Sequence, residues 1–143
     1  MIGQTKNLHS WILSLNLLKD KRNMEELTKV EERIMQQLWS LKKAFVKDII
    51  EQLPDDPKPP YNTISSVIRI LVTKGYVRYK AYGKTYEYYP AISKTEYRKV
   101  RLKKIMSNYF GNSPATLVSH IVKEEKLTKE EIQQLKALID KME

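Results

Sequence analysis

The sequence has no cysteine, and its only histidines are His9 and His120. Without thiolates a chain has no disulfide, no cysteine-bound zinc finger and no thiolate redox chemistry. Two histidines far apart in the sequence leave a metal site or a histidine-based catalytic triad incomplete. We therefore expect a protein that is not an enzyme, carries no cofactor or metal and acts on no small-molecule substrate. A cysteine-free composition is compatible with the reducing cytoplasm, where we expect the protein to act.

Long hydrophobic runs are also absent. The most apolar early stretch, Leu8 to Leu18, is interrupted by polar residues, and it is shorter than the roughly 20 apolar residues that span a bilayer. Only Lys6 precedes this stretch, whereas a secretory signal peptide carries its positive charges before the apolar run. We interpret residues 1–23 as an N-terminal extension, with Met24 as a candidate natural start. The alternative is an amphipathic anchor or an additional packing helix.

Acidic residues are missing from the middle of this basic chain. The net charge is +9 and the isoelectric point is about 9.6, which favours a polyanionic partner, nucleic acid before an anionic membrane. The alternative is a basic protein whose charge serves solubility. Between Asp56 and Glu87 there is no acidic residue, and the basic residues of that window are Lys58, Arg69, Lys74, Arg78, Lys80 and Lys84. We expect phosphate groups to bind there.

Apolar residues at helical spacing predict two helices before a proline-rich break. Thr28 and Glu31 form a capping box, which starts a helix over residues 29–40. A shorter apolar face from Val46 to Leu53 predicts the second helix. Prolines then end the helical pattern, because proline lacks the amide donor that a helix needs. They are Pro54, Pro57, Pro59 and Pro60.

A third helix follows the prolines and has two different faces. Its apolar residues recur at helical spacing and end before Gly75, which is suited to a left-handed helix cap. The apolar positions are Ile64, Val67, Ile68, Leu71 and Val72. The opposite face is polar, short-chained and basic, and its residues are Asn62, Ser65, Ser66 and Arg69.

The period then changes to that of β-strands. Residues 77–82 and 85–89 alternate around Gly83, which predicts a hairpin that ends at Pro90. Its aromatic residues include Tyr79, Tyr86, Tyr88 and Tyr89. We expect these tyrosines to pack across the strands, with base stacking in a single-strand binder as the alternative.

Three further amphipathic helices complete the chain, beginning after Ser93, Ser113 and Thr128. We therefore predict a mainly α fold with a small β-hairpin. Its parts are a winged helix-turn-helix DNA-binding domain over residues 24–91 and a C-terminal helical dimerisation domain over residues 92–143.

The predicted DNA-binding residues lie on the third helix and on the hairpin. A helix fits the major groove, where short polar and guanidinium side chains reach base edges, and a neighbouring hairpin contacts phosphates. The predicted residues are Asn62, Thr63, Ser65, Ser66 and Arg69 on the helix, and Arg78, Lys80, Tyr82 and Lys84 on the hairpin. The alternatives are a solvated helix face, a winged-helix module that binds protein, and a ligand-responsive regulator with a small-molecule pocket between the two domains.

The C-terminal helices cannot bury their apolar faces alone. Pairing with a second copy is the usual solution, so we expect a homodimer that binds a palindromic operator in double-stranded DNA. The residues expected at the dimer interface are Tyr97, Ile105, Tyr109, Leu117, Val118, Ile121, Ile132, Leu135, Leu138 and Ile139.

Four segments together resemble the BlaI/MecI penicillinase repressors, to which the copper-responsive CopY repressors are related. The segments are LTKVEERIMQQLW, NTISSVIRILVTKGYV, GKTYEYYPAISKTEYRK and YFGNSPATLVSHIVKEEKLTKEEIQQL. The resemblance runs from Leu27 to the C-terminus and implies a dimeric winged-helix transcriptional repressor. Residues that match the family's DNA-contacting positions are Asn62, Thr63, Ser65 and Ser66. Many relatives carry a basic residue at the position of Ser65.

The resemblance also implies how the repressor is released from DNA. In the penicillinase branch a membrane-bound zinc metallopeptidase senses a β-lactam, and the repressor is then cut in its dimerisation region. The matching segment runs from Leu117 to Ile121. His120 and Ile121 are the candidate cleavage region, where some relatives have asparagine and phenylalanine. CopY-like proteins bind metal through C-terminal cysteines, so copper sensing by that route is excluded.

Overall fold

The structure is a computed structural model that describes residues 24–141, so the predicted N-terminal extension lies outside the described residues. The described chain forms two units, of which the first ends at Tyr97 and the second begins at Arg98. The sequence placed this boundary after residue 91. The first unit continues further because the side chain of Tyr97 packs into its core.

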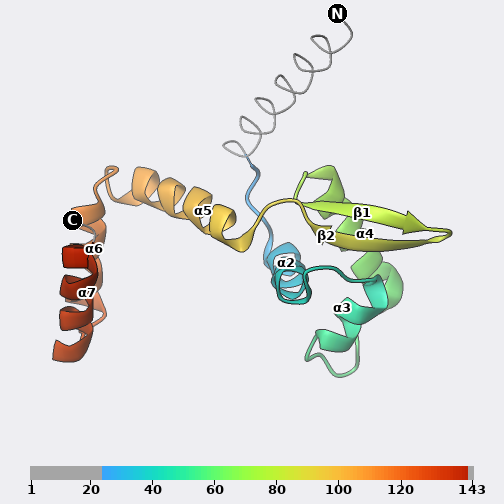
Figure 1. The fold of residues 1–143 in the computed structure, drawn as a ribbon, viewed down its shortest axis with the longest axis horizontal. Helices are drawn as coiled ribbons and strands as arrows, with labels where there is room; N and C mark the ends of the chain where they lie inside the picture. The colour runs from blue at the N-terminus through green and yellow to red at the C-terminus, as the bar shows by residue number, and fades with distance from the viewer. Residues whose placement is uncertain (1–23, 142–143) are drawn as a thin grey trace, which may run out of the picture. The chain divides into compact units, whose positions relative to one another are not determined.

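Three helices form the body of the first unit (Figure 1). They are α2 (Lys29–Leu41), α3 (Val46–Gln52) and α4 (Tyr61–Thr73). The predicted capping box at the start of α2 is confirmed, since Glu31 N donates to Thr28 Oγ1 and Thr28 N donates to Glu31 Oε2, each at 3.2 Å. Two free backbone donors of the first helical turn are satisfied in this way.

A single hydrophobic core joins these helices to the hairpin. The side chains at its centre are at most 1% exposed and include Ile34, Met35, Leu38, Ile49, Leu53, Ile68, Leu71, Tyr76 and Val77. Burying one such aliphatic side chain contributes roughly 1.5–3 kcal/mol to folding. The same burial fixes which side of α4 faces inward.

The hairpin consists of β1 (Val77–Tyr82) and β2 (Thr85–Pro90), which pair antiparallel from Val77 opposite Pro90 to Tyr82 opposite Thr85. Gly83 in the turn has φ +61°, a left-handed conformation that glycine adopts without a steric penalty. Ala44 forms an isolated antiparallel β-bridge with Tyr88 of β2. The Ala44 N–H donates to Tyr88 O at 2.9 Å, and the Ala44 carbonyl accepts from Tyr88 N at 2.8 Å.

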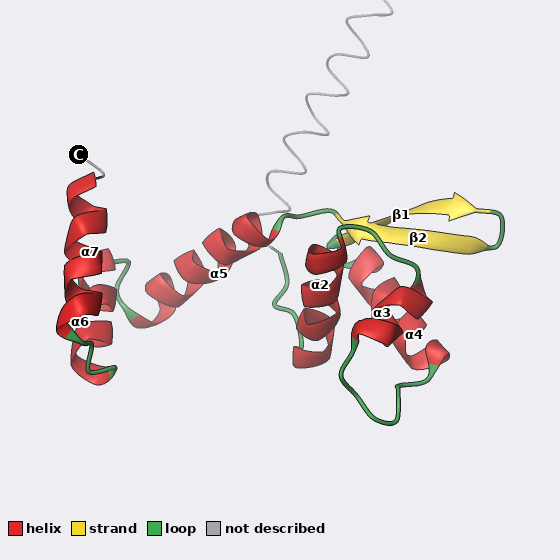
Figure 2. Cartoon of the chain, turned by 60° about the horizontal axis from the view of Figure 1, so that its bottom comes forward, coloured by secondary structure: helices red, strands yellow, loops and turns green. Residues whose placement is uncertain are grey.

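Three helices followed by a two-stranded antiparallel hairpin constitute a winged helix (Figure 2). The predicted mainly α fold with a small hairpin is therefore confirmed. The distal half of the hairpin projects past the helices as the wing (Figures 1 and 2).

The second unit contains most of α5 (Lys94–Tyr109), together with α6 (Pro114–Glu124) and α7 (Lys129–Lys141). Ser113 caps α6, since its hydroxyl accepts from Thr116 N at 3.1 Å. Neither α6 nor α7 has a buried residue within the described chain. No helix of residues 24–141 combines the length and the apolar character needed to cross a membrane.

Tyr97 does not belong with the predicted dimer-interface residues. It is only 7% exposed, and its ring lies 5.3 Å from the ring of Trp39 and 6.0 Å from that of Tyr76. These contacts place it in the core of the first unit. The helical pattern of α5 grouped Tyr97 with Ile105 and Tyr109, but the first turn of the helix packs against a different unit.

Candidate nucleic-acid interface

One side of α4 is exposed and polar. Its four exposed predicted residues are Asn62, Thr63, Ser66 and Arg69, which we call the reading face. Ile64, Ile68 and Leu71 on the other side are at most 4% exposed. Because the apolar side packs into the core, the reading face points to solvent and is free to meet a partner.

Ser65 is not part of the reading face. It is 8% exposed and lies on the packed side of α4, so the prediction that it is exposed for base contact is wrong. Residue spacing alone put Ser65 beside Ser66, but a hydroxyl group is small enough to be included in the packed side. The local sequence pattern does not distinguish the two serines.

Three further exposed residues lie on α4, and none of them is among the predicted site residues. They are Tyr61, which is 57% exposed, Ile70, which is 46% exposed, and Thr73. Thr73 follows Arg69 by one helical turn, a spacing that could have identified it. Ser66 Oγ donates to Asn62 O at 2.8 Å, which leaves the lone pairs of the hydroxyl able to accept a hydrogen bond.

The N-terminus of α4 has no side-chain cap and no acidic residue in its first turn. The carbonyl of Pro60 accepts from Thr63 N at 3.1 Å and from Ile64 N at 3.3 Å. The N-terminal end of a helix carries a partial positive charge and presents backbone N–H groups. Such an end is suited to bind a phosphate group.

The wing presents its predicted basic residues on one face and at its tip. Arg78, Lys80 and Tyr82 share the outer face of the hairpin, and Lys84 is exposed next to the turn glycine. The ammonium of Lys80 lies 5.2 Å from the centre of the Tyr82 ring, a cation–π distance. This contact leaves both side chains solvent-accessible.

The positive charge of the segment between Asp56 and Glu87 is partly offset in the folded chain by an acidic residue outside that segment. Antiparallel pairing places Glu87 directly opposite Lys80 on the outer face of the hairpin. A carboxylate at that position weakens the positive potential around Lys80. Lys84 has no such acidic neighbour across the hairpin, since the paired residue at that end of the sheet is Thr85 opposite Tyr82.

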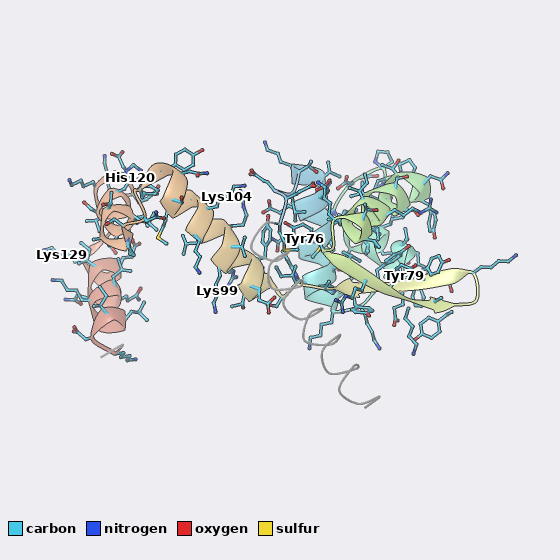
Figure 3. All side chains as sticks on the ribbon, turned by 90° about the horizontal axis from the view of Figure 1, so that it is seen from above. Tyr76, Tyr79, Lys99, Lys104, His120 and Lys129 are labelled. Carbon is cyan, nitrogen blue, oxygen red and sulfur yellow. The ribbon has the colours of Figure 1, made fainter. Side chains whose placement is uncertain are left out.

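Three of the four predicted tyrosines, Tyr79, Tyr86 and Tyr88, pack across the strands on the inner face of the hairpin, whereas Tyr89 lies on the outer face opposite Arg78. The Tyr79 ring lies 4.9 Å from the Tyr86 ring and 6.0 Å from the Tyr88 ring. Burial raises the pKa of Tyr88, and the positive charge of nearby Arg69 opposes this rise. Arg69 of the reading face therefore lies near Tyr88 on the inner face of the hairpin. Tyr79, on the same face of the hairpin and labelled in Figure 3, is 50% exposed.

A charged cluster holds α4 against the start of α2. Lys74, which follows α4, donates to the two carboxylate oxygens of Glu31 at 2.9 and 3.1 Å. The Glu31 side chain is 7% exposed, that of Lys74 is 18% exposed, and Glu25 lies 3.7 Å from the Lys74 ammonium. The hydrogen bonds that Lys74 donates to the Glu31 carboxylate raise the pKa of Lys74. The cluster ties one end of α4 to the body of the domain, and so helps to orient the reading face.

Replacing Glu31 by glutamine is expected to lower the free energy of unfolding by about 2 kcal/mol, because it removes the carboxylate to which Lys74 donates both hydrogen bonds and leaves only the more distant Glu25 beside the ammonium. Urea denaturation followed by tryptophan fluorescence measures the change. Glu32→Gln is the matched control, since Glu32 is the next residue of the same helix and is exposed. Equal stability of the two variants would show that the cluster does not support α4.

Within residues 24–141, histidine and carboxylate side chains do not gather in a group of three or more that could hold a metal ion. The side chains on the reading face and the wing are amide, hydroxyl, guanidinium and ammonium groups. Such groups form hydrogen bonds and ion pairs with phosphates and base edges.

Two solved structures of DNA-binding proteins resemble this chain. The solution structure of the DNA-binding domain of the repressor BlaI matches with a TM-score of 0.45 and 20% identity, over 52% of this chain and 90% of that one. The crystal structure of a mutant MarR from E. coli complexed with operator DNA matches with a TM-score of 0.43 and 13% identity, over 99% of this chain and 97% of that one.

Relatives in sequence cover most of the chain. The methicillin resistance regulatory protein MecI of Staphylococcus aureus is 25% identical over 116 residues, which is 81% of this chain and 94% of that protein. The penicillinase repressor of Bacillus licheniformis is 18% identical over 119 residues, which is 83% of this chain and 93% of that protein.

A family model described as penicillinase repressor matches residues 27–141. The match includes the winged helix and the C-terminal helices, and it begins at Leu27, where the resemblance in the sequence begins. The chain therefore belongs to the penicillinase repressor family of DNA-binding transcriptional repressors.

Proposed function

We propose that this protein is a homodimeric repressor that acts in the cytoplasm, binds a palindromic operator and is inactivated by proteolysis in its dimerisation region. The observation that carries the proposal is the reading face of α4, which is exposed, polar and next to a basic hairpin in a member of a repressor family. The relatives bear repressor or regulator names, which supports the same activity here.

In the proposed complex, α4 lies in the major groove. Asn62 and Arg69 have the side chains that pair with adenine and guanine edges, and the Ser66 hydroxyl is able to accept from a base amino group. The uncapped N-terminus of α4 fits a backbone phosphate, which would set how deeply the helix enters the groove.

The wing contributes the part of binding that does not depend on base sequence. Lys84 at the tip and Arg78 and Lys80 on the outer face are exposed and are placed to contact phosphates along the neighbouring backbone. Contacts of this kind release counterions, so the affinity falls steeply with salt.

Dimerisation is supported by the apolar side chains that the second unit leaves exposed. Tyr109 is 76% exposed, and Leu138 and Ile139 are 60% and 61% exposed. Further exposed or partly exposed members of the predicted interface are Ile105, Leu117, Val118, Ile121, Ile132 and Leu135. A second copy would cover these residues, and two-fold symmetry would then present two copies of α4 to half-sites about 34–36 Å apart or a multiple of that distance.

Release by proteolysis is supported by the low burial of α6. His120 and Ile121 are both exposed, and the His120 ring contacts Phe110 at 5.5 Å between ring centroids. In the single chain α6 has no buried residue, and such a helix opens locally at low cost, which a protease needs in order to bind the backbone. In the proposed dimer Ile121 is covered by the second copy, so the cut requires the interface to open at α6. A membrane-bound sensor metallopeptidase would supply the cut. Mass spectrometry after β-lactam exposure of the native cell is expected to show cleavage near His120, and an intact chain during derepression would refute this step.

Selection of bound duplexes from a random-sequence library tests the core of the proposal. We expect the recovered DNA to contain an inverted repeat, and we expect its affinity to fall steeply as salt increases. A protein-interaction module, the rival function, would recover no motif and would show no steep salt dependence. Either of these results would overturn the proposal that the chain reads DNA.

A further inference from the structure

A groove of about 680 Å³ lies on the first unit, and none of its lining residues belongs to the reading face or to the predicted residues of the wing. It is lined by Gln36, Trp39, Ser40, Lys42, Pro90, Ile92, Ser93 and Lys94. These residues come from the C-terminal half of α2, the end of β2 and the connection into α5. We call it the linker groove. Its size falls in the range of small-molecule sites, about 300–1,000 Å³.

The lining combines an aromatic wall with positive charge. Trp39, Pro90 and Ile92 supply apolar surface, and the two charged lining residues, Lys42 and Lys94, are both cationic and exposed. Ser and Gln side chains supply hydrogen-bonding groups between them. An apolar surface with converging polar groups of one charge is suited to an amphipathic ligand of the opposite charge.

The backbone around the groove is held in a defined geometry. The indole N–H of Trp39 donates to Ile92 O at 2.9 Å, which links α2 to the connection into α5. Lys42 has φ +70° and ψ −41°, a conformation that residues with a side chain rarely adopt. Its N–H donates to Leu38 O at 2.8 Å, so the end of α2 keeps Lys42 at the groove despite this strain.

We propose that the linker groove binds a small planar aromatic anion, with its ring against Trp39 and its acidic group near Lys42 and Lys94. The acidic group is a carboxylate or a sulfonate. Ile92 and Ser93 belong to the chain that joins the hairpin to α5, and Pro90 ends β2 just before it, so an occupant of the groove holds this connection in one geometry. This step rests on the proposed function, in which α5 leads to a dimer interface. In that case a ligand in the linker groove changes the affinity of the dimer for DNA.

The test uses the full chain with Trp11→Phe, which leaves Trp39 as the single tryptophan. The probe is 1-anilinonaphthalene-8-sulfonate, and its control is N-phenyl-1-naphthylamine, which has the same ring system without the sulfonate. We expect one sulfonate probe to bind per chain and to change the Trp39 fluorescence. The affinity of the neutral probe is expected to be at least about fivefold lower than that of the sulfonate probe, because the neutral probe forms no ion pair with the lysines.

Substitution of the lysines locates the probe. Lys42→Gln with Lys94→Gln is expected to weaken the sulfonate probe about fivefold. Lys43→Gln with Lys47→Gln is the matched control, because both residues are exposed and neither lines the groove. Equal binding of the charged and neutral probes, equal effects of the two double variants, or no saturable binding would overturn the proposal. A loss of affinity for a selected duplex in Lys42→Gln with Lys94→Gln, measured without probe, would also overturn it, since the groove would then be part of the DNA interface.

A final measurement separates this proposal from the proposed function. The affinity for a selected duplex is measured over a range of probe concentrations, and the change in DNA affinity is expected to need about fivefold more probe in Lys42→Gln with Lys94→Gln than in the unsubstituted chain. Probe binding without any DNA binding would refute the repressor function and keep the groove. Probe binding with unchanged DNA affinity would keep the groove and refute its regulatory role.

Discussion

Replacing Leu138 by aspartate is expected to convert the protein to a monomer and to weaken operator binding about 100-fold or more. Leu138 is 60% exposed in the single chain, so the substitution costs the isolated chain little. In a dimer the same position would place two unpaired carboxylates in an apolar interface. A monomer has half of the DNA contacts and no gain from simultaneous binding of two half-sites.

Sedimentation equilibrium at micromolar concentration and titration of a selected duplex measure the two effects. Gln133→Asp is the matched control, because Gln133 is exposed and helical spacing puts it on the side of α7 opposite Leu138 and Leu135. The control is expected to remain dimeric and to bind DNA normally. A dimeric Leu138→Asp variant, or a monomer with undiminished operator affinity, would show that α7 does not form the interface.

Replacing Arg69 by alanine is expected to weaken binding to a selected operator by about 1–3 kcal/mol, which corresponds to roughly 5-fold to 150-fold. Arg69 is exposed on the reading face and lies near the inner face of the wing. A guanidinium in the major groove pairs with two acceptors of guanine. Because this loss concerns a base contact, binding to a scrambled duplex should change little.

Lys84→Ala provides the contrasting variant. Lys84 is exposed beside the turn of the wing, and loss of a phosphate contact should weaken selected and scrambled duplexes alike. The slope of log affinity against log salt should then flatten by about one unit. Titrations of both duplexes at several salt concentrations distinguish the two variants. If Arg69→Ala weakens both duplexes equally, Arg69 does not contact a base. If neither variant changes binding, α4 and the wing are not part of the interface.

Much of the fold was predictable from local sequence signals. The capping box of Thr28 and Glu31, the proline-rich break and the change of period at Val77 each depend on residues close in the sequence. Hydrogen bonds at helix starts and the burial of one helix face follow from such short-range patterns. For this reason the helices and the hairpin lie where the sequence predicts them.

The site was predictable in part. Asn62, Thr63, Ser66 and Arg69 are exposed on α4, and the predicted wing residues are exposed on the hairpin. Helical spacing defines a polar side of α4 but does not define its edge. Whether a small residue at that edge is covered depends on packing against elements that are distant in the sequence.

By itself, the sequence determined the winged helix, the family and the basic character of the surface, because periodicity, capping and charge are properties of short segments. Only the tertiary structure decided that Ser65 is covered, that Tyr97 joins the core of the first unit, and that Glu87 faces Lys80. It also revealed that Glu31 binds Lys74 across 43 positions of sequence separation. Each of these outcomes depends on which segments pack together, and burial and charge pairing are set by such long-range contacts rather than by residue spacing.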